Sequence, residues 1–298
     1  MHALITGASG FVGRHLIPRL LGEDWRVTPY DLELDVLDGA AVQAAFDRDR
    51  PDAVIHLAAQ ASVSQSRSAP ALTHRVNYLG TLSVLRAALR CKSRPRLLLI
   101  GSGDQYGTTR PGSPPFAEDA PLHPGSAYSR SKVEAEQLAS AYADAGVDVV
   151  CVRSFNHAGP GQSPIYVLSS FARQIAQVEL GLREPVMRVG NLESVRDIID
   201  VNDVVEAYRL LLDRGVRASI YNVAGGVGRS VGSLLEGLLA HASKRPAIEI
   251  DSALVRPTDH SVGDSSRLRA ATGWKPAIPI EDTLLRMLDY WRGEFIGS

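Results

Sequence analysis

The sequence predicts an α/β fold in which a doubly wound parallel sheet is accompanied by a smaller, interleaved α+β lobe. Two observations lead to this expectation. Short runs of Val, Ile and Leu alternate with helical patterns through the first half of the chain, which is typical of parallel strands buried on both faces. Beyond residue 155 the alternation breaks down and glycine and proline accumulate, which indicates a second, differently built part.

Continuous apolar runs bounded by turn residues indicate five strands in the first half. They fall at residues 3–6, 25–30, 52–57, 96–100 and 147–152. Long helical patterns at 69–89 and 127–142 separate the later strands. In the second half we expect a late strand of the same sheet at 221–224 and helices at 167–180, 204–212, 231–240 and 283–291.

The composition excludes several classes of protein. With 32 Lys and Arg against 33 Asp and Glu, the 298-residue chain has a formal net charge of -1, which argues against a nucleic-acid surface or a polybasic membrane face. Cys91 and Cys151 lie far apart without metal-ligand spacing, so neither a disulfide framework nor a metal site is expected. No signal peptide or membrane-spanning run is evident, and we expect a cytoplasmic protein.

A glycine-rich turn, Gly7-Ala8-Ser9-Gly10-Phe11-Val12-Gly13, joins the first strand to the first helix. The first glycine permits a tight turn, the second lets a pyrophosphate approach the backbone, and the third allows close helix–sheet packing. The alternative is an accidental glycine-rich turn. Its position directly after the first strand predicts instead a Rossmann dinucleotide site, with Gly7, Gly10, Phe11, Val12 and Gly13 at the cofactor.

This motif divides the chain by function. We assign residues 1–163, completed by segments within 198–226, to an NAD(P)-binding Rossmann domain. Residues 164–197 and 227–298 are expected to form the substrate-binding lobe.

Acidic residues after the second strand are expected to hold the adenosine half of the cofactor. Asp31 ends that strand and favours NAD, because a carboxylate repels a ribose phosphate; Asp35 and Val36 would flank the adenine. Arg14 could instead pair with a ribose phosphate, or be an ordinary exposed helix arginine. The choice between NADPH and NADH stays open.

A tyrosine and a lysine, Tyr128 and Lys132, lie four residues apart early in a predicted helix. This spacing places both side chains on one face, where the ammonium group would lower the pKa of the phenol. Ser102 follows the fourth strand at the carboxyl edge of the sheet, where sites in parallel sheets form. We therefore expect Ser102, Tyr128 and Lys132 to act together on a carbonyl or alcohol.

Over nearly its whole length the sequence resembles the extended short-chain dehydrogenase/reductases that act on nucleotide sugars. Its second half resembles one branch, the GDP-mannose 4,6-dehydratases and GDP-6-deoxy-4-keto-mannose reductases. The motifs of the first half are Gly7 to Gly13, His56-Leu57-Ala58-Ala59-Gln60, Asn77 with Gly80-Thr81, Ser102, Tyr106-Gly107, Tyr128, Lys132, and Arg153 with Phe155-Asn156. Those of the second half are Val189 to Leu192, Val195-Arg196-Asp197, Arg256-Pro257-Thr258, Gly263-Asp264 and Gly273 to Pro276.

The resemblance implies roles for matched residues. Tyr128 would protonate the alkoxide formed at C4 of a keto-sugar, Ser102 would hydrogen-bond the same oxygen, and Lys132 would hold the nicotinamide ribose. Leu57, Ala58, Ala59 and Phe155 would line the cofactor, whereas Gln60, Asp104, Gln105 and Asn156 would contact the substrate. Arg196 and Arg256 match the positions that grip the substrate diphosphate, with a surface ion pair as the alternative for each.

Two enzyme activities compete within this branch. The dehydratases place a glutamate base, preceded by a small hydroxyl residue, just before the Tyr-Gly pair, but this chain has Gly103-Asp104-Gln105-Tyr106-Gly107. A shortened base and a missing hydroxyl favour reduction of GDP-4-keto-6-deoxy-mannose to a GDP-6-deoxyhexose such as GDP-rhamnose.

A 4,6-dehydratase or an epimerase is the nearest alternative to this reductase, and a non-catalytic dinucleotide-sensing protein is a remote one. Family members commonly dimerise through the long helices at 69–89 and 127–142, so we expect a homodimer.

Overall fold

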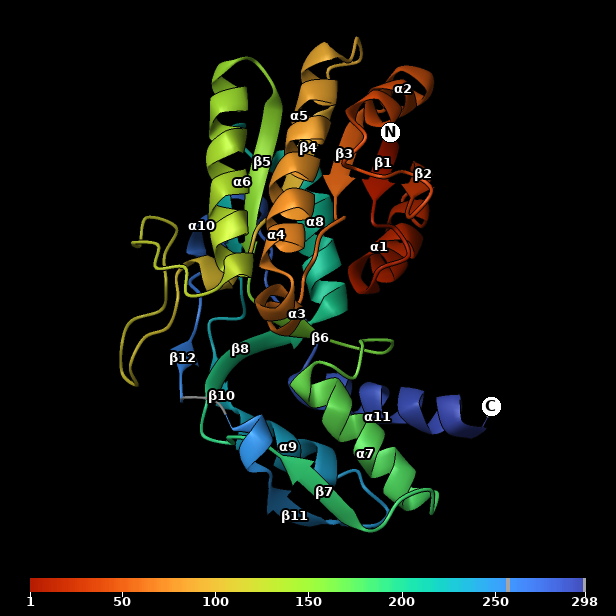
Figure 1. Ribbon diagram of the computed structural model, residues 1–298, viewed down its shortest axis with the longest axis vertical. Coiled ribbons are helices and arrows are strands. Elements are labelled where there is room, and N and C mark those ends of the chain that lie inside the picture. The colour runs from red at the N-terminus through yellow and green to blue at the C-terminus, as the bar shows by residue number, and fades with distance from the viewer. Residues whose placement is uncertain (256–257, 297–298) are drawn as a thin grey trace.

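The computed structural model describes residues 1–255 and 258–296 and has two layered parts (Figure 1). The larger part is built on a six-stranded sheet in the order β2-β1-β3-β4-β5-β9, and every pairing in it is parallel. The doubly wound parallel fold and all six strands predicted for this sheet are therefore confirmed. The strands are β1 (His2–Thr6), β2 (Arg26–Tyr30), β3 (Ala53–His56), β4 (Arg96–Ile100), β5 (Asp148–Ser154) and β9 (Ile220–Val223).

Helices cover both faces of this sheet. On one face, α1 (Phe11–Leu21) and α8 (Val201–Arg214) bury apolar side chains against the strands. On the other face lie α2 (Gly39–Asp49), α5 (Gly80–Arg90) and α6 (Ala127–Asp144). Because strand residues alternate between the two cores, the central strands β1, β3, β4 and β5 are mostly apolar, which is the pattern that predicted them, whereas β2 at the edge is mixed.

The helical stretch expected at 69–89 is divided in the structure. It consists of α4 (Pro70–His74), a π-helical turn η1 (Arg75–Leu79) and α5. Within the π-turn, Asn77 is buried, and its amide nitrogen donates to Gln60 O over 3.2 Å and to Ser131 Oγ over 2.9 Å. The π-turn lies where this inward side chain joins the segment after β3 to α6, and such turns often occur at functional sites.

Three α-helices were not predicted, namely α2, α3 (Val63–Ser68) and α10 (Ser266–Thr272). In α2, the Asp38 side chain accepts hydrogen bonds from the backbone N–H groups of Ala40 and Ala41, a cap that the sequence signals through an aspartate before an alanine-rich run. The short α3 follows Ser62, whose hydroxyl accepts from Gln65 N.

The smaller part is arranged around β8 (Val195–Asp200), below the large sheet in Figure 1. β8 pairs antiparallel with β10 (Gly228–Ser230) and parallel with β6 (Asn156–Ala158) and β12 (His260–Ser261). A second pair joins β7 (Val186–Val189) to β11 (Ala247–Ile250). The domain division given above stays a prediction; β6, although it directly follows β5, pairs in this smaller sheet.

Three helices form the core of the smaller part. They are α7 (Val167–Glu179), α9 (Val231–Leu239) and α11 (Ile280–Ile296), each with one apolar face turned toward the others. Short helices η2 (Gly103–Gln105), η3 (Ser252–Leu254) and α10 (Ser266–Thr272) complete the described elements. Within the described ranges, none of the helices has the length and apolarity needed to span a membrane.

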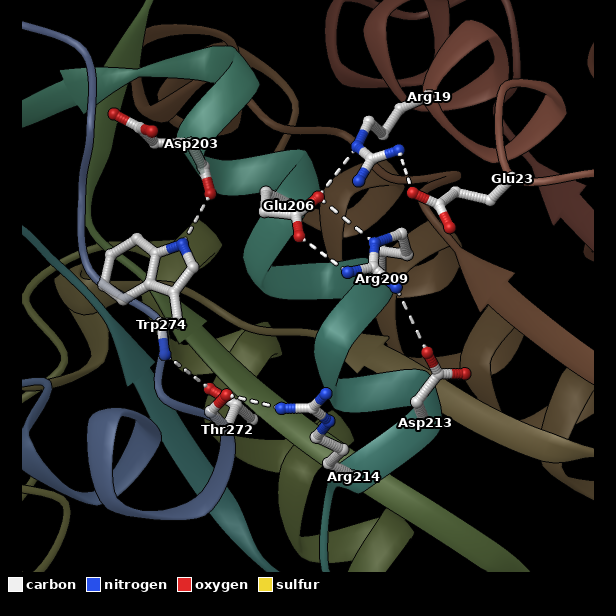
Figure 2. Close-up of polar contacts among 9 residues, drawn as sticks. All are labelled: Arg19, Glu23, Asp203, Glu206, Arg209, Asp213, Arg214, Thr272 and Trp274. Carbon is white, nitrogen blue, oxygen red and sulfur yellow. Dashed lines mark hydrogen bonds and ion pairs between the residues drawn. The ribbon is translucent and has the colours of Figure 1, made fainter.

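Helix α8 holds the C-terminal segment and α1 in place (Figure 2). Trp274 Nε1 donates to Asp203 O over 2.9 Å, and the Asp203 carboxylate accepts from the N–H groups of Ala277 and Ile278. On the opposite side of α8, an ion pair of 2.7 Å joins Arg19 of α1 to Glu206. The smaller part is therefore anchored on the same helix that packs against the large sheet.

Candidate active site

The glycine turn lies where its function requires. Gly7 has φ +69°, and a Cβ there would lie 2.7 Å from Ala58 N, so only glycine fits between β1 and the segment after β3. Gly10 N donates to Gly7 O over 3.1 Å and starts α1, and a Cβ on Gly13 would collide with the Ala8 backbone. The turn thus brings the α1 N-terminus close to the strand edge, which suits a diphosphate.

The residues predicted for the adenosine half lie beside this turn. Asp31 directly follows β2, and its Oδ2 accepts a hydrogen bond of 2.6 Å from Ser9 N. Asp35 is exposed, whereas Val36 is buried and packs against Gly80, where a Cβ would lie 2.7 Å from Val36 Cγ2. The structure brings Asp31 into direct contact with the phosphate-binding turn.

The residues after β3 complete this side of the site. Leu57, Ala58 and Ala59 are partly exposed, and the backbone of Leu57 and Ala58 lies against Gly7. Gln60 is held by Asn77, whose Oδ1 accepts from Gln60 N over 2.8 Å. The two predicted cofactor segments, after β1 and after β3, are therefore neighbours.

Arg14 reaches across the molecule. Its Nη2 donates to Gly161 O over 2.9 Å, and together with Phe11 and Tyr166 it lines a pocket of about 420 Å³ between α1 and the segment before α7. The Asp31 carboxylate accepts a hydrogen bond from Ser9 N rather than from Arg14. A ribose-phosphate role for Arg14 stays a prediction, and its observed contact joins the cofactor turn to the smaller part.

The structure brings Ser102, Tyr128 and Lys132 together. Ser102 is two residues beyond β4, and Tyr128 and Lys132 lie one turn apart in α6, which is capped by the Ser126 hydroxyl. The Ser102 side chain lies close enough to the Tyr128 phenol to lower its pKa, and Lys132 Nζ donates to Ile100 O over 2.7 Å. The arrangement expected from the sequence is present.

The electrostatics of the tyrosine differ from the expectation. Burial raises the pKa of Tyr128 above its ordinary value of 10, the Asp104 charge raises it further, and only the Ser102 side chain opposes the rise. Burial also lowers the pKa of Lys132 to about 8. The prediction of a lowered tyrosine pKa beside Lys132 is therefore wrong, because burial of the phenol raises that pKa instead. Tyr128 is a protonated phenol at neutral pH and can donate a proton.

Arg196 and Asp104 lie near each other at the start of the smaller sheet. The Asp104 side chain is exposed at its surface, but desolvation by the protein around it raises its carboxyl pKa. The Arg196 charge opposes this rise, and the Asp259 charge adds to it. Arg196 Nη2 donates to Asp259 Oδ2 over 2.6 Å, so the ion pair considered as the alternative is present. Its partner is not the neighbouring Asp197, which accepts from Gly225 N and Gly226 N.

The structure supports a ligand contact for only some of the other residues predicted at the site. Asn156 is exposed on β6 and open to a ligand. Gln105 is fully buried, and both polar atoms of its side chain are hydrogen-bonded within the protein, so its predicted contact with substrate is wrong. Phe155 is buried against Gly103, and its cofactor contact stays a prediction. Arg256 lies outside the described residues.

Three residues of the site were not assigned a role from the sequence. Tyr166, which precedes α7, raises the pKa of Tyr128 through its proximity and lines the pocket with Phe11. Its only signal was its place after a glycine- and proline-rich segment. Asn77 and Arg153 belong to recognised motifs, but their contacts depend on distant segments.

The two histidines near the site are not exposed acids or bases. His56 is 3% exposed, its Nδ1 lies 2.7 Å from Thr6 Oγ1, and burial followed by the Lys132 charge lowers its pKa to about 3. His157 stacks on Phe11 with 5.9 Å between ring centroids, and burial lowers its pKa too. Both are neutral packing residues at physiological pH.

Fold and site together define a class, the NAD(P)-binding oxidoreductases with a Ser-Tyr-Lys set on a doubly wound sheet. Residues 3–224 match the NAD dependent epimerase/dehydratase family, and the chain belongs to that family, as the resemblance implied.

Three relatives illustrate this membership. The GDP-6-deoxy-D-mannose reductase of Pseudomonas aeruginosa is 37% identical over 292 residues, which cover 96% of both chains. The structure of RMD from Pseudomonas aeruginosa complexed with NADPH matches with a TM-score of 0.93 at 36% identity, covering 98% of this chain and 99% of that chain. The UDP-glucose 4-epimerase of Thermus thermophilus, in complex with NAD, matches with a TM-score of 0.87 at 28% identity, covering 98% of this chain and 99% of that chain.

Proposed function

We propose that this protein reduces the C4 ketone of GDP-4-keto-6-deoxy-mannose to a GDP-6-deoxyhexose such as GDP-rhamnose, with NADPH or NADH as reductant. The observation that carries the proposal is the buried, protonated Tyr128 phenol beside the buried Ser102 side chain, one helical turn from Lys132. The similarity to a GDP-6-deoxy-D-mannose reductase over almost the whole chain supports the same substrate.

The cofactor site fits a dinucleotide. Gly7 and Gly13 leave room that a Cβ would fill, and Asp31 is positioned at the turn by Ser9 N. The glycine turn would hold the diphosphate, and Lys132 would hold the nicotinamide ribose. A reduced nicotinamide supplies the hydride for the reaction.

The chain's own residues manage the proton and the developing charge. As the C4 carbonyl oxygen becomes an alkoxide, Tyr128 transfers its phenolic proton to that oxygen, and the phenolate recovers a proton from solvent. Ser102 donates a hydrogen bond to the same oxygen and stabilises its negative charge. A raised pKa suits this direction of reaction, because Tyr128 stays protonated until the oxygen becomes basic.

The GDP-sugar would be held by the smaller part. Asn156 presents an exposed amide, and Arg196 presents a guanidinium that Asp259 already orients. Arg256 is assigned to the same diphosphate on its sequence position alone. Asp104 would accept a hydrogen bond from a sugar hydroxyl.

Dehydration is disfavoured by the turn after Ser102. The dehydratases carry a hydroxyl residue where this chain has Gly103, and a Cβ on Gly103 would lie 3.0 Å from the Phe155 ring. A side chain there requires Phe155 to move, so the packing supports the choice of reductase.

The decisive experiment gives the purified protein either GDP-mannose or GDP-4-keto-6-deoxy-mannose. Oxidation of added NADPH or NADH with the keto-sugar alone supports the proposal. Formation of a keto-sugar from GDP-mannose without added reductant would instead identify a dehydratase.

A homodimer and a cytoplasmic location complete the proposal. Helices α4 to α6 lie side by side, and Leu72 of α4 and Leu79 of η1 are exposed. This face would pack against its equivalent in a second copy. Free, buried Cys91 and Cys151 suit a reducing compartment. Light scattering on wild type and on a Leu79→Arg variant tests the dimer, with a monomeric variant expected.

A further inference from the structure

A buried polar cluster lies directly behind Ser102. It consists of Gln105, Glu136 and Arg153, which are 0%, 8% and 4% exposed. These side chains come from three elements, η2, α6 and β5. Because a buried amide and a buried ion pair are costly unless every polar atom is satisfied, their arrangement requires a physical explanation.

Gln105 controls the backbone of Ser102. Gln105 Oε1 accepts a hydrogen bond of 2.8 Å from Ser102 N, and Gln105 N donates to Ser102 O over 3.1 Å. The Ser102 hydroxyl in turn accepts from Asp104 N over 3.1 Å, which closes a reciprocal capping box around the turn. The direction in which the Ser102 side chain leaves the sheet therefore depends on Gln105.

The orientation of the Gln105 amide is set by charge. Its Nε2 donates to Glu136 Oε2 over 3.1 Å. A carboxylate can only accept hydrogen bonds, so the NH₂ group must face Glu136 and the oxygen must face Ser102 N. The reverse orientation would place two acceptors together on one side and two donors on the other.

Arg153 fixes the carboxylate itself. Its Nε donates to Glu136 Oε2 over 2.9 Å and its Nη2 to Glu136 Oε1 over 2.6 Å, a two-pronged pair. Arg153 Nη1 donates to Tyr106 Oη over 2.8 Å and to Glu118 O over 3.0 Å, so the guanidinium is held on its other side too.

The helix that carries the proton donor also carries this carboxylate. Tyr128, Lys132 and Glu136 are spaced four residues apart in α6 and therefore lie along one face. Lys132 contacts the end of β4, and Glu136 contacts the turn that follows it. The backbone at Gly101 is tightly packed against this cluster, because a Cβ there would collide with Gln105 Oε1 and lie 2.7 Å from Val152 O.

We propose that Gln105, oriented by the Glu136–Arg153 pair, is a positioning residue that holds Ser102 in register with Tyr128. This inference rests on the function proposed above, because it assigns the geometry of the same Ser102 hydroxyl. Gln105 touches neither substrate nor cofactor, and it acts through the main chain of Ser102.

A double-mutant cycle tests this route of action. Gln105→Met keeps the side-chain length and removes both hydrogen bonds, and we expect kcat to fall about tenfold with KM for the cofactor unchanged. In a Ser102→Ala background the same substitution should have no further effect on kcat, because the group it positions is gone. An equal loss in both backgrounds, or no loss in either, overturns the proposal.

A matched control separates this effect from loss of stability. Gln174 is a buried glutamine of α7 whose amide also bonds the backbone, donating to Arg188 O and accepting from Arg188 N. Gln174→Met should lower the Tm and leave kcat unchanged. If it lowers kcat as much as Gln105→Met does, the loss at Gln105 is a general structural effect and the proposal is wrong.

An exchange of charge gives a second, independent variant. Gln105→Glu alone places two carboxylates in contact and should lower kcat at least as far as Gln105→Met. Adding Glu136→Gln is not expected to restore kcat, because Arg153 Nε also donates to Glu136 Oε2 and would face the NH₂ group of the new amide. A Gln105→Glu variant that keeps the wild-type kcat contradicts the proposal.

A substrate-independent measurement distinguishes this inference from the proposed function. Hydrogen exchange of the Ser102 amide, followed in the cofactor-bound enzyme by mass spectrometry of peptides spanning it, should accelerate about tenfold or more in Gln105→Met. Unchanged exchange overturns the positioning role. Inactivity of the wild type on the keto-sugar, with accelerated exchange in the variant, refutes the proposed function alone.

Discussion

The Lys132 ammonium group donates a 2.7 Å hydrogen bond to the carbonyl oxygen of Ile100, the last residue of β4. This contact sets α6 against the strand that leads into Ser102, and it fixes the height of Tyr128 above the sheet edge. The proton donor and the hydroxyl that assists it are therefore aligned by regular secondary structure, which is more rigid than a loop.

Replacing Tyr128 by Phe removes the proton donor and leaves the ring. We expect kcat to fall about 10²–10⁴-fold with little change in NADPH affinity, because the phenol acts only on the developing alkoxide. Steady-state kinetics and fluorescence titration measure the two quantities. Tyr221→Phe is the control, since the Tyr221 hydroxyl is also buried but bonds Val216 N. Retained turnover in Tyr128→Phe would remove its assigned role.

Replacing Arg196 by Met should weaken substrate binding. We expect KM for the GDP-sugar to rise about 10- to 100-fold with kcat changed less, since a phosphate contact persists throughout the reaction. Asp259→Asn is the matched control, because it breaks the same 2.6 Å ion pair without removing the guanidinium. If both variants show the same rise in KM, Arg196 is a structural partner of Asp259 only.

Gly13→Ala should destroy the cofactor site. The added Cβ meets the Ala8 backbone, which cannot move without shifting the turn, so we expect at least a tenfold rise in the Kd for NADPH and a loss of roughly 1–3 kcal/mol in unfolding free energy. The same change at Gly293 of α11, where nothing lies within 4 Å, should raise stability by about 0.5–1 kcal/mol. Normal cofactor binding by Gly13→Ala would contradict this account.

Burial of His56 predicts a dependence of stability on acid. Its pKa is about 3 in the folded protein against 6.5 when exposed, so below pH 6.5 the unfolded chain binds a proton that the folded chain does not. As the pH is lowered from 6.5 to about 3, the free energy of unfolding therefore decreases by about 1.4 kcal/mol per pH unit.

His56→Asn removes this group. Denaturant unfolding of wild type and variant between pH 7 and pH 4 should therefore show a shallower decline for the variant. Parallel curves for the two proteins would show that His56 is already protonated in the folded state, or equally buried in the unfolded one.

The large sheet could be predicted because its signals are local. Apolar runs mark each strand, and Gly7, Gly10 and Gly13 mark the turn at which the cofactor residues meet. The π-turn around Asn77 could not be predicted, since it depends on contacts with Gln60 and Ser131 from other elements. The strands that pair with β8 in the smaller sheet are only two or three residues long and lie far from it in the sequence, so their residues show no recognisable alternation of apolar and polar side chains.

The site was predictable in its residues and less so in its electrostatics. Spacing placed Tyr128 beside Lys132, but the pKa of the phenol is governed by burial, which no spacing reports. Arg196 was assigned to the substrate diphosphate with a surface ion pair as the alternative, and the structure pairs it with Asp259, 63 residues away. Gln105 shows the same limit, because its burial follows from packing between η2 and α6.

The central claim is that hydride reaches C4 of a GDP-keto-sugar while Tyr128 supplies the proton. The most direct measurement incubates the enzyme with GDP-4-keto-6-deoxy-mannose and reduced cofactor deuterated at the nicotinamide C4, followed by NMR of the product. The account predicts deuterium at C4 of a GDP-6-deoxyhexose, with one cofactor oxidised per sugar and no product from the Tyr128→Phe variant. A product without deuterium at C4, or turnover without net oxidation of the cofactor, would contradict it.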